Sequence, residues 1–202
     1  MAYSRRLFAR PLLASFGMAL VWSGTAPAQM PTYGIGRAPA ADEVRAIDIS
    51  IGPEGKELPP GSGTAKQGAP IYAQKCASCH GKNASEGGQS GDPARPFSPP
   101  LVGGRGTLTS STPKRTIESY WPFATTVWDY INRGMPRKQE GTLKPDEVYA
   151  LTAFLLYRSG IIKEDDVMDA KSLPKVQMPN RNGFVPAKPE RWWKPGDPSQ
   201  KP

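Results

Sequence analysis

Cys76-Ala77-Ser78-Cys79-His80 holds the only two cysteines and the only histidine of the chain. The spacing C-x-x-C-H is typical of covalent attachment of a c-type haem. Two thiols three residues apart can add to the two vinyl groups of one haem, and the histidine that follows can ligate the iron through an imidazole nitrogen. The stretch therefore predicts one covalent haem c, held by Cys76 and Cys79, with His80 as a metal ligand.

Other uses of two cysteines explain the sequence less well. A zinc site needs two further Cys or His ligands, and the chain has none left. A thioredoxin-like redox pair is expected in a βαβ context, which the surrounding pattern does not indicate. A disulfide across two intervening residues closes a very small loop and stabilises little.

The N-terminus has the features of an export signal. Arginines at positions 5, 6 and 10 precede a mostly apolar run over 12–22, and Ala26-Pro27-Ala28 is a small-residue cleavage site. The alternative of a retained membrane anchor is weaker because the apolar run is too short to span a bilayer. We expect residues 1–28 to be a signal peptide that is cleaved after Ala28, and the mature protein to be periplasmic without a permanent membrane anchor.

The net charge of the mature chain indicates which class of partner it would bind. Removing residues 1–28, which carry three arginines and no acidic residue, lowers the formal charge from +8 to +5. A moderately basic exported protein suits acidic protein partners, because complementary charge steers association. The basic residues are scattered and form no nucleic-acid motif, so no nucleic-acid partner is expected.

The mature chain divides into three regions. Residues 29–63 are rich in Gly and Pro and are expected to be an extended N-terminal segment, with a short strand or extended stretch at 47–51. Residues 64–160 carry the helical patterns, and 161–202 form a tail with seven prolines. The expected fold class is all-α around one haem c, with extended N- and C-terminal segments.

Three helices are predicted inside residues 64–160. The first runs from about Ala65 through Cys76, and the second covers Ala124 to Arg133 before Gly134. The third begins at Pro145, which suits the first helical position, and ends at Arg158 before a glycine. The Pro-rich tail cannot continue this helical core, yet it has more apolar residues than a linker needs, including Trp192 and Trp193. It is expected to lie against either its own domain or a partner.

With a single histidine, the sixth iron ligand must be methionine, a weaker donor, or absent. Met30, Met135, Met168 and Met178 remain after removal of the signal peptide. Met135 is favoured because it follows a helix that ends at Gly134 and precedes Pro136, so a constrained turn presents its thioether. Met178, which also precedes a proline, remains the alternative.

Together, Cys76-x-x-Cys79-His80 and Met135-Pro136 resemble a class I cytochrome c over residues 64–160. The resemblance implies that the carbonyl of Pro99, or of Pro100 if the register differs by one, accepts the N–H of the proximal histidine, with Leu101 beside it. It also implies close packing of the first helix on the last. The positions for that packing would be Gly68, Tyr72, Leu151 and Phe154.

A narrower resemblance covers most of the mature chain. The segments 58–63, 121–131, 164–170 and 173–181 are similar to the cytochrome subunit of Sox-type sulfane (sulfite) dehydrogenases. This implies a molybdenum-cofactor dehydrogenase subunit as electron donor and a downstream cytochrome c as acceptor in sulfur-compound oxidation. The chain would then have no catalysis of its own. Some members carry two haems, whereas this chain has one attachment motif.

Several side chains are candidates for the haem surroundings. Trp121, Trp128 and Tyr130 are expected to form the haem wall or to bond a propionate, with core packing as the alternative. Arg105 is a further propionate candidate. Two other functions remain open: a haem enzyme with an exchangeable sixth ligand, and a freely diffusing carrier. Deletion of residues 161–202 is expected to weaken a partner complex and to leave the haem spectrum intact.

Overall fold

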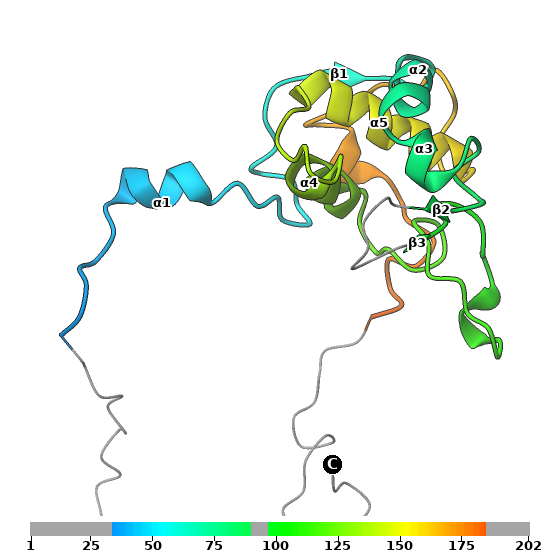
Figure 1. The fold of residues 1–202 in the computed structure, drawn as a ribbon, viewed down its shortest axis with the longest axis horizontal. Helices are drawn as coiled ribbons and strands as arrows, with labels where there is room; N and C mark the ends of the chain where they lie inside the picture. The colour runs from blue at the N-terminus through cyan, green and yellow to red at the C-terminus, as the bar shows by residue number, and fades with distance from the viewer. Residues whose placement is uncertain (1–33, 90–96, 185–202) are drawn as a thin grey trace, which may run out of the picture. The chain divides into compact units, whose positions relative to one another are not determined.

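The computed structural model describes residues 34–89 and 97–184. The chain forms two units, residues 1–39 and 40–202. Of the first unit, residues 34–39 are described, and they are exposed and without helix or strand. The described helices and strands lie in the second unit (Figure 1). The expected signal peptide at 1–28 and the Trp192-Trp193 pair fall outside the described residues.

Two helices that are distant in sequence cross at the centre of the second unit. Helix α2 spans Ala65–Lys75, and Thr64 caps its N-terminus. The Thr64 side chain accepts from the backbone N–H of Gln67, and the Gln67 side chain accepts from the backbone N–H of Thr64, which forms a capping box. Helix α5 (Pro145–Arg158) begins with a proline and two acidic residues, which favour a helix N-terminus. Figure 1 shows α5 running beside α2.

Gly68 is the position where the backbones of these helices approach most closely. A Cβ there would overlap the backbone carbonyl of Ala150 and lie 2.8 Å from the Cβ of Phe154. One turn later the ring of Tyr72 lies 4.9 Å from that of Phe154, centroid to centroid. The expected crossing is therefore present, with Ala150 rather than Leu151 opposite the glycine.

A partly exposed ion pair also joins α2 to α5. Lys75 Nζ donates to Glu147 Oε1 at 2.9 Å, and the other carboxylate oxygen of Glu147 accepts from the backbone N–H of Lys144 at the start of α5. The bond from Lys144, and then the bond from Lys75, lower the pKa of Glu147 below its ordinary 4.5. The folded state therefore favours the ionised carboxylate.

This lowered pKa predicts an acid-dependent loss of stability. The contribution of Glu147 should be complete above the pKa of the unfolded chain and should disappear as the pH falls through the lower folded pKa. Glu147→Gln should flatten the dependence of the unfolding free energy on pH below about pH 5. Urea unfolding at a series of pH values measures this, and Glu164→Gln, at an exposed position, controls for the lost charge. An unchanged slope for Glu147→Gln would contradict the prediction.

Helix α4 (Ala124–Gly134) packs on α5 through aromatic and aliphatic side chains. Trp128 is 1% exposed, and its ring lies 5.5 Å from that of Tyr149 on α5. Asp129, also buried, accepts from the backbone N–H of Ile51 at 2.9 Å and from the Arg133 side chain, so the segment before α2 is fastened to α4. The helices at 65–75, 124–134 and 145–158 match the predicted ones to within one residue at each end.

The all-α expectation needs correction in small elements. Strand β1 (Ser62–Gly63) pairs antiparallel with β4 (Met168–Asp169), and β2 (Gly88–Gln89) pairs antiparallel with β3 (Phe97–Ser98). Two-residue strands have no periodic pattern, so sequence periodicity cannot reveal them. Three further short elements follow α2: helix α3 (Ala77–His80) and the 3₁₀ turns η1 (Thr107–Thr109) and η2 (Leu173–Lys175).

The N-terminal segment also differs from expectation. Residues 41–47 form helix α1 (Ala41–Ile47), in which the Glu43 carboxylate accepts from the backbone N–H of Ala40, and 48–51 form no strand. The alternation of isoleucines at 47–51 was too short to specify a strand against this local capping. All residues from 34 to 50 are exposed.

The segment after α5 belongs to the core as far as residue 178. Met168, Leu173, Val176 and Met178 are at most 9% exposed and join the same apolar cluster as α4 and α5. Of the two surroundings considered for this segment, its own domain is the one that residues 161–178 contact. A deletion from residue 161 would therefore expose the core, so a truncation that tests the tail should begin after residue 178.

Candidate functional site

The attachment motif lies at the junction of two helices. Helix α2 ends at Lys75, and Cys76 has a φ of −125°. Cys79 and His80 lie on the single turn of α3. In this turn the N–H of His80 donates to the Cys76 carbonyl at 3.0 Å. Cys76 and Cys79 are partly buried and form no disulfide with each other. Burial raises the pKa of the Cys76 thiol to about 11, so this sulfur is protonated at neutral pH. Both sulfurs thus lie on one turn beside the histidine.

The imidazole of His80 is held by one backbone contact. Its Nδ1 lies 3.1 Å from the carbonyl oxygen of Pro99, and the side chain is 9% exposed. Because a carbonyl only accepts, Nδ1 carries the proton and donates. Desolvation lowers the pKa of His80, against the opposing effect of this hydrogen bond, so the ring is neutral at physiological pH. The lone pair of Nε2 is left to bind a metal.

The structure places Pro99, not Pro100, in contact with the histidine. The next residue but one, Leu101, is partly buried against the core, and its N–H donates to the Ala84 carbonyl at 2.7 Å. The carbonyl of Leu101 accepts from the N–H of Ile117 at 3.0 Å. The two backbone bonds of Leu101 therefore fix the chain directly after the histidine's partner.

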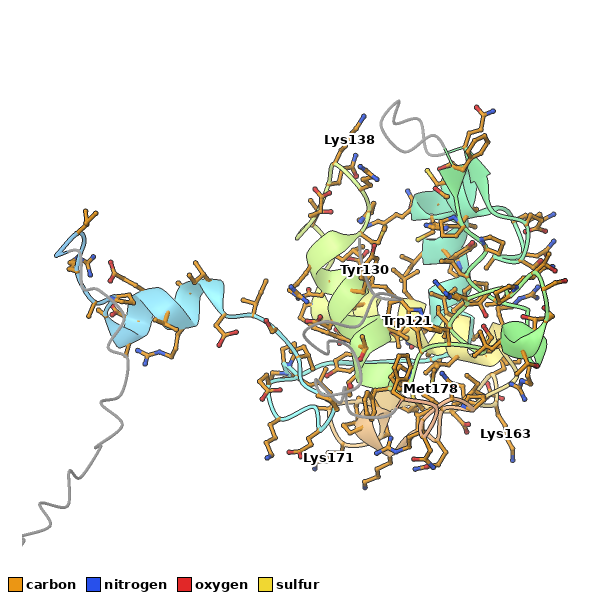
Figure 2. All side chains as sticks on the ribbon, turned by 90° about the horizontal axis from the view of Figure 1, so that it is seen from below. Trp121, Tyr130, Lys138, Lys163, Lys171 and Met178 are labelled. Atoms are coloured by element: carbon orange, nitrogen blue, oxygen red, sulfur yellow. The ribbon has the colours of Figure 1, made fainter. Side chains whose placement is uncertain are left out.

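The two candidate methionines lie at opposite ends of α4. Met135 follows the C-terminal end of the helix directly. Near Met178, the Asn180 side chain donates to the Tyr120 carbonyl and Arg181 lies over the ring of Phe123, both before the helix starts. An eleven-residue helix is about 16 Å long. Figure 2 agrees, because Met178 lies far from Lys138 in the loop after Met135.

Burial distinguishes these methionines further. Met178 is 3% exposed and is enclosed by the core. Met135 is partly buried and packs against that core from outside, as Cys76 and Leu101 also do. Met135 is therefore the more accessible of the two thioethers. This difference favours Met135 as the ligand.

The aromatic candidates separate into two groups. Trp121 and Tyr130 contact each other edge to face at 5.7 Å, and Tyr130 is 51% exposed (Figure 2). Trp128 is buried, and its indole Nε1 has no hydrogen-bond partner among the described residues. A buried N–H without an acceptor is costly, so such a donor points to an acceptor outside the chain. A haem propionate would supply one.

Two other predicted side chains already have protein partners. The hydroxyl of Tyr72 donates to the Gly81 carbonyl at 2.9 Å, which ties α2 to the residue after His80. The guanidinium of Arg105 donates to the Ser159 carbonyl at 2.8 Å, at the C-terminal end of α5. Tyr72 therefore holds the loop that follows the histidine. Arg105 contacts the end of α5, and its role at a propionate stays a prediction.

The residues present fit a covalently bound haem. Two thiols on one turn, a neutral imidazole with Nδ1 anchored, and a partly uncovered thioether are the donors that c-type attachment and His/Met ligation need. The unpaired indole N–H of Trp128 adds a donor for a carboxylate. Cys76 and Cys79 would hold the group, and His80 and Met135 would ligate its iron.

Two comparisons with known proteins give matches. The family model described as cytochrome c oxidase, cbb3-type, subunit III matches residues 63–155. A solved structure, that of the sulfane dehydrogenase SoxCD from Paracoccus pantotrophus, is 41% identical, with a TM-score of 0.69 over 81% of this chain and 77% of that one. The chain belongs to the class I cytochrome c family.

The cytochrome's resemblance to Sox-type sulfane dehydrogenase is confirmed by the same comparison. Comparison with curated proteins gave no match. Among the described residues, no helix is long and apolar enough to cross a membrane.

Sequence reasoning missed the loop that follows His80 in this cytochrome. Ala84 is fully buried with φ +62°, and its carbonyl accepts from the N–H groups of both Leu101 and Val102. Gly87 and Gly88 were visible as a glycine pair, but nothing local in the sequence indicated which segment they approach. Only the folded chain brings them beside Ser98 and Cys79.

Proposed function

We propose that this cytochrome is a periplasmic electron-transfer subunit. It accepts electrons from a molybdenum-cofactor subunit that oxidises sulfane sulfur or sulfite, and it passes them to a downstream cytochrome c. The chain performs no substrate chemistry itself. The observation that carries the proposal is the 41% identity to sulfane dehydrogenase SoxCD, which extends over 81% of this chain.

The extent of the similarity supports a fixed complex rather than a freely diffusing carrier. The general family model matches residues 63–155, which is the haem domain. The alignment with the SoxCD structure covers 81% of 202 residues, about 164, and so includes long segments outside that domain. A carrier would need only the haem domain, whereas flanking segments shared with a member of an enzyme complex suit partner binding.

The chain's own residues prepare the site for electron transfer. Haem c supplies a one-electron couple between ferric and ferrous iron when it is bound. The Pro99 carbonyl orients His80 and keeps its proton on Nδ1, which leaves Nε2 for the iron. Burial of His80 and packing of Met135 against the core limit water near both ligands. Thioether ligation opposite histidine raises the reduction potential, which suits an electron acceptor.

Co-purification with metal analysis tests the proposal. The full-length cytochrome, co-expressed with the molybdenum-cofactor subunit encoded in the same organism, should co-purify with molybdenum and haem in a constant ratio. Adding sulfite or a sulfane-sulfur compound should reduce the haem only when that subunit is present. Rapid carbon monoxide binding by the wild-type protein would instead favour a haem enzyme, and the absence of a complex would contradict the proposal.

The test of the C-terminal tail must respect the packing of residues 161–178. A chain ending at residue 184 keeps Met168, Leu173 and Met178 in the core, so its haem spectrum should be unchanged. Comparing its co-purification with that of the full chain isolates the contribution of residues 185–202.

A further inference from the structure

The carbonyl that accepts from His80 belongs to a segment with an unusual constraint. Pro99 and Pro100 have no backbone N–H, so neither residue can donate a hydrogen bond to hold itself in place. Backbone N–H donors that hold this segment therefore come from the residues on either side, Ser98 before and Leu101 and Val102 after. The contacts of these flanking residues therefore decide the length of the bond to His80.

The loop at residues 81–89, which begins directly after His80, supplies contacts on both sides. The carbonyl of Ala84 accepts from the N–H of Leu101 at 2.7 Å and from that of Val102 at 3.1 Å. On the other side, strand β2 pairs with β3, so that Gly88 lies opposite Ser98. The histidine and its acceptor are thus joined through one short loop.

Gly87 is the position in this loop where an added side chain would meet the acceptor segment. Its φ is +70°, in the left-handed region that favours glycine. A Cβ at this position would lie 2.6 Å from the carbonyl oxygen of Ser98 and 3.2 Å from both the ring nitrogen and the Cδ of Pro100. These atoms flank the Pro99 carbonyl in the chain. Any side chain at 87 would therefore push directly on the residues that place the acceptor.

We propose that Gly87 is a positioning residue that sets the hydrogen bond from His80 Nδ1 to Pro99, and through it the reduction potential of the bound haem. A shorter bond makes the imidazole a stronger donor, which stabilises ferric iron and lowers the potential. The proposal rests on haem ligation by His80 within the proposed function, and it does not depend on the identity of the partner.

The test compares side chains added at two glycines with nearly equal φ angles. Gly141 has φ +75°, and a Cβ there would meet nothing within 4 Å, so it matches the backbone strain at Gly87 without the contact. Gly87→Ala and Gly141→Ala form one pair. Gly87→Asn and Gly141→Asn form a milder pair, because Asn tolerates the left-handed region better than Ala.

The readouts are the reduction potential of the haem-loaded protein and the hydrogen exchange of the His80 Nδ1 proton, followed by NMR in the reduced state. Both Gly87 variants should raise the potential and accelerate this exchange, whereas both Gly141 variants should match the wild type. A haem-loaded Gly87→Asn protein with unchanged potential and exchange would overturn the proposal. Wild-type protein without covalent haem would overturn the ligation itself.

Discussion

Replacement of Met135 with alanine is expected to let the reduced protein bind carbon monoxide and to lower its reduction potential. The thioether of Met135 is the proposed sixth ligand, and its removal opens that position of the iron to small molecules. It also removes the donor that raises the potential relative to stronger ligands. Wild-type protein should bind little carbon monoxide and the variant should bind close to one equivalent, as measured by optical titration.

Met178→Ala is the matched control for this experiment. Met178 is 3% exposed in the core at the other end of α4, so its truncation should cost about 2–5 kcal/mol of unfolding free energy. Its haem spectrum and potential should stay those of the wild type. Carbon monoxide binding by Met178→Ala, with Met135→Ala unaffected, would assign the sixth ligand to Met178.

Gly68→Ala is expected to destabilise the fold more than any other single-methyl addition to a helix of this chain. The new Cβ would overlap the backbone carbonyl of Ala150, and a backbone atom cannot move aside as a flexible side chain can. Overpacking of a core typically costs about 1–3 kcal/mol, and this contact belongs at or above the upper end. For a protein of this size, about 3 kcal/mol lowers the melting temperature by roughly 6–12 °C.

Gly134→Ala adds the same methyl group to another helix. Gly134 ends α4, and a Cβ there would lie 3.9 Å from the nearest ring atom of Tyr130, an ordinary contact. Since alanine favours a helix over glycine, stability should be unchanged or slightly increased. Calorimetry of both variants measures the difference, and equal melting temperatures would show that α2 and α5 can separate without cost.

Helix-capping residues and the haem attachment motif made much of the fold and the site predictable from the sequence. Pro145 with Asp146 and Glu147 specified the start of α5, and Gly134 specified the end of α4, because these preferences act within a few residues. The attachment motif was equally local, since its three reactive side chains lie on one turn. The family resemblance added Pro99, which no local rule identifies.

The features that the sequence did not predict depend on contacts between residues that are far apart in the chain. The left-handed Ala84 is stabilised by bonds to Leu101 and Val102, and no propensity scale predicts a buried alanine in that conformation. Likewise, the apolar residues at 168–178 were recognised, but their neighbours could not be named without the folded chain. The alternating isoleucines at 47–51 did not specify a strand, because the local capping that forms α1 outweighed so short a pattern.

The ladder of β1 and β4 gives the domain a property that its helices alone would not have. Ser62 lies opposite Asp169, so the residues just before α2 pair with residues that follow α5. The ladder can close only after residue 169 has been synthesised. Proteolytic cleavage beside either strand would therefore remove the pairing partner of the other strand.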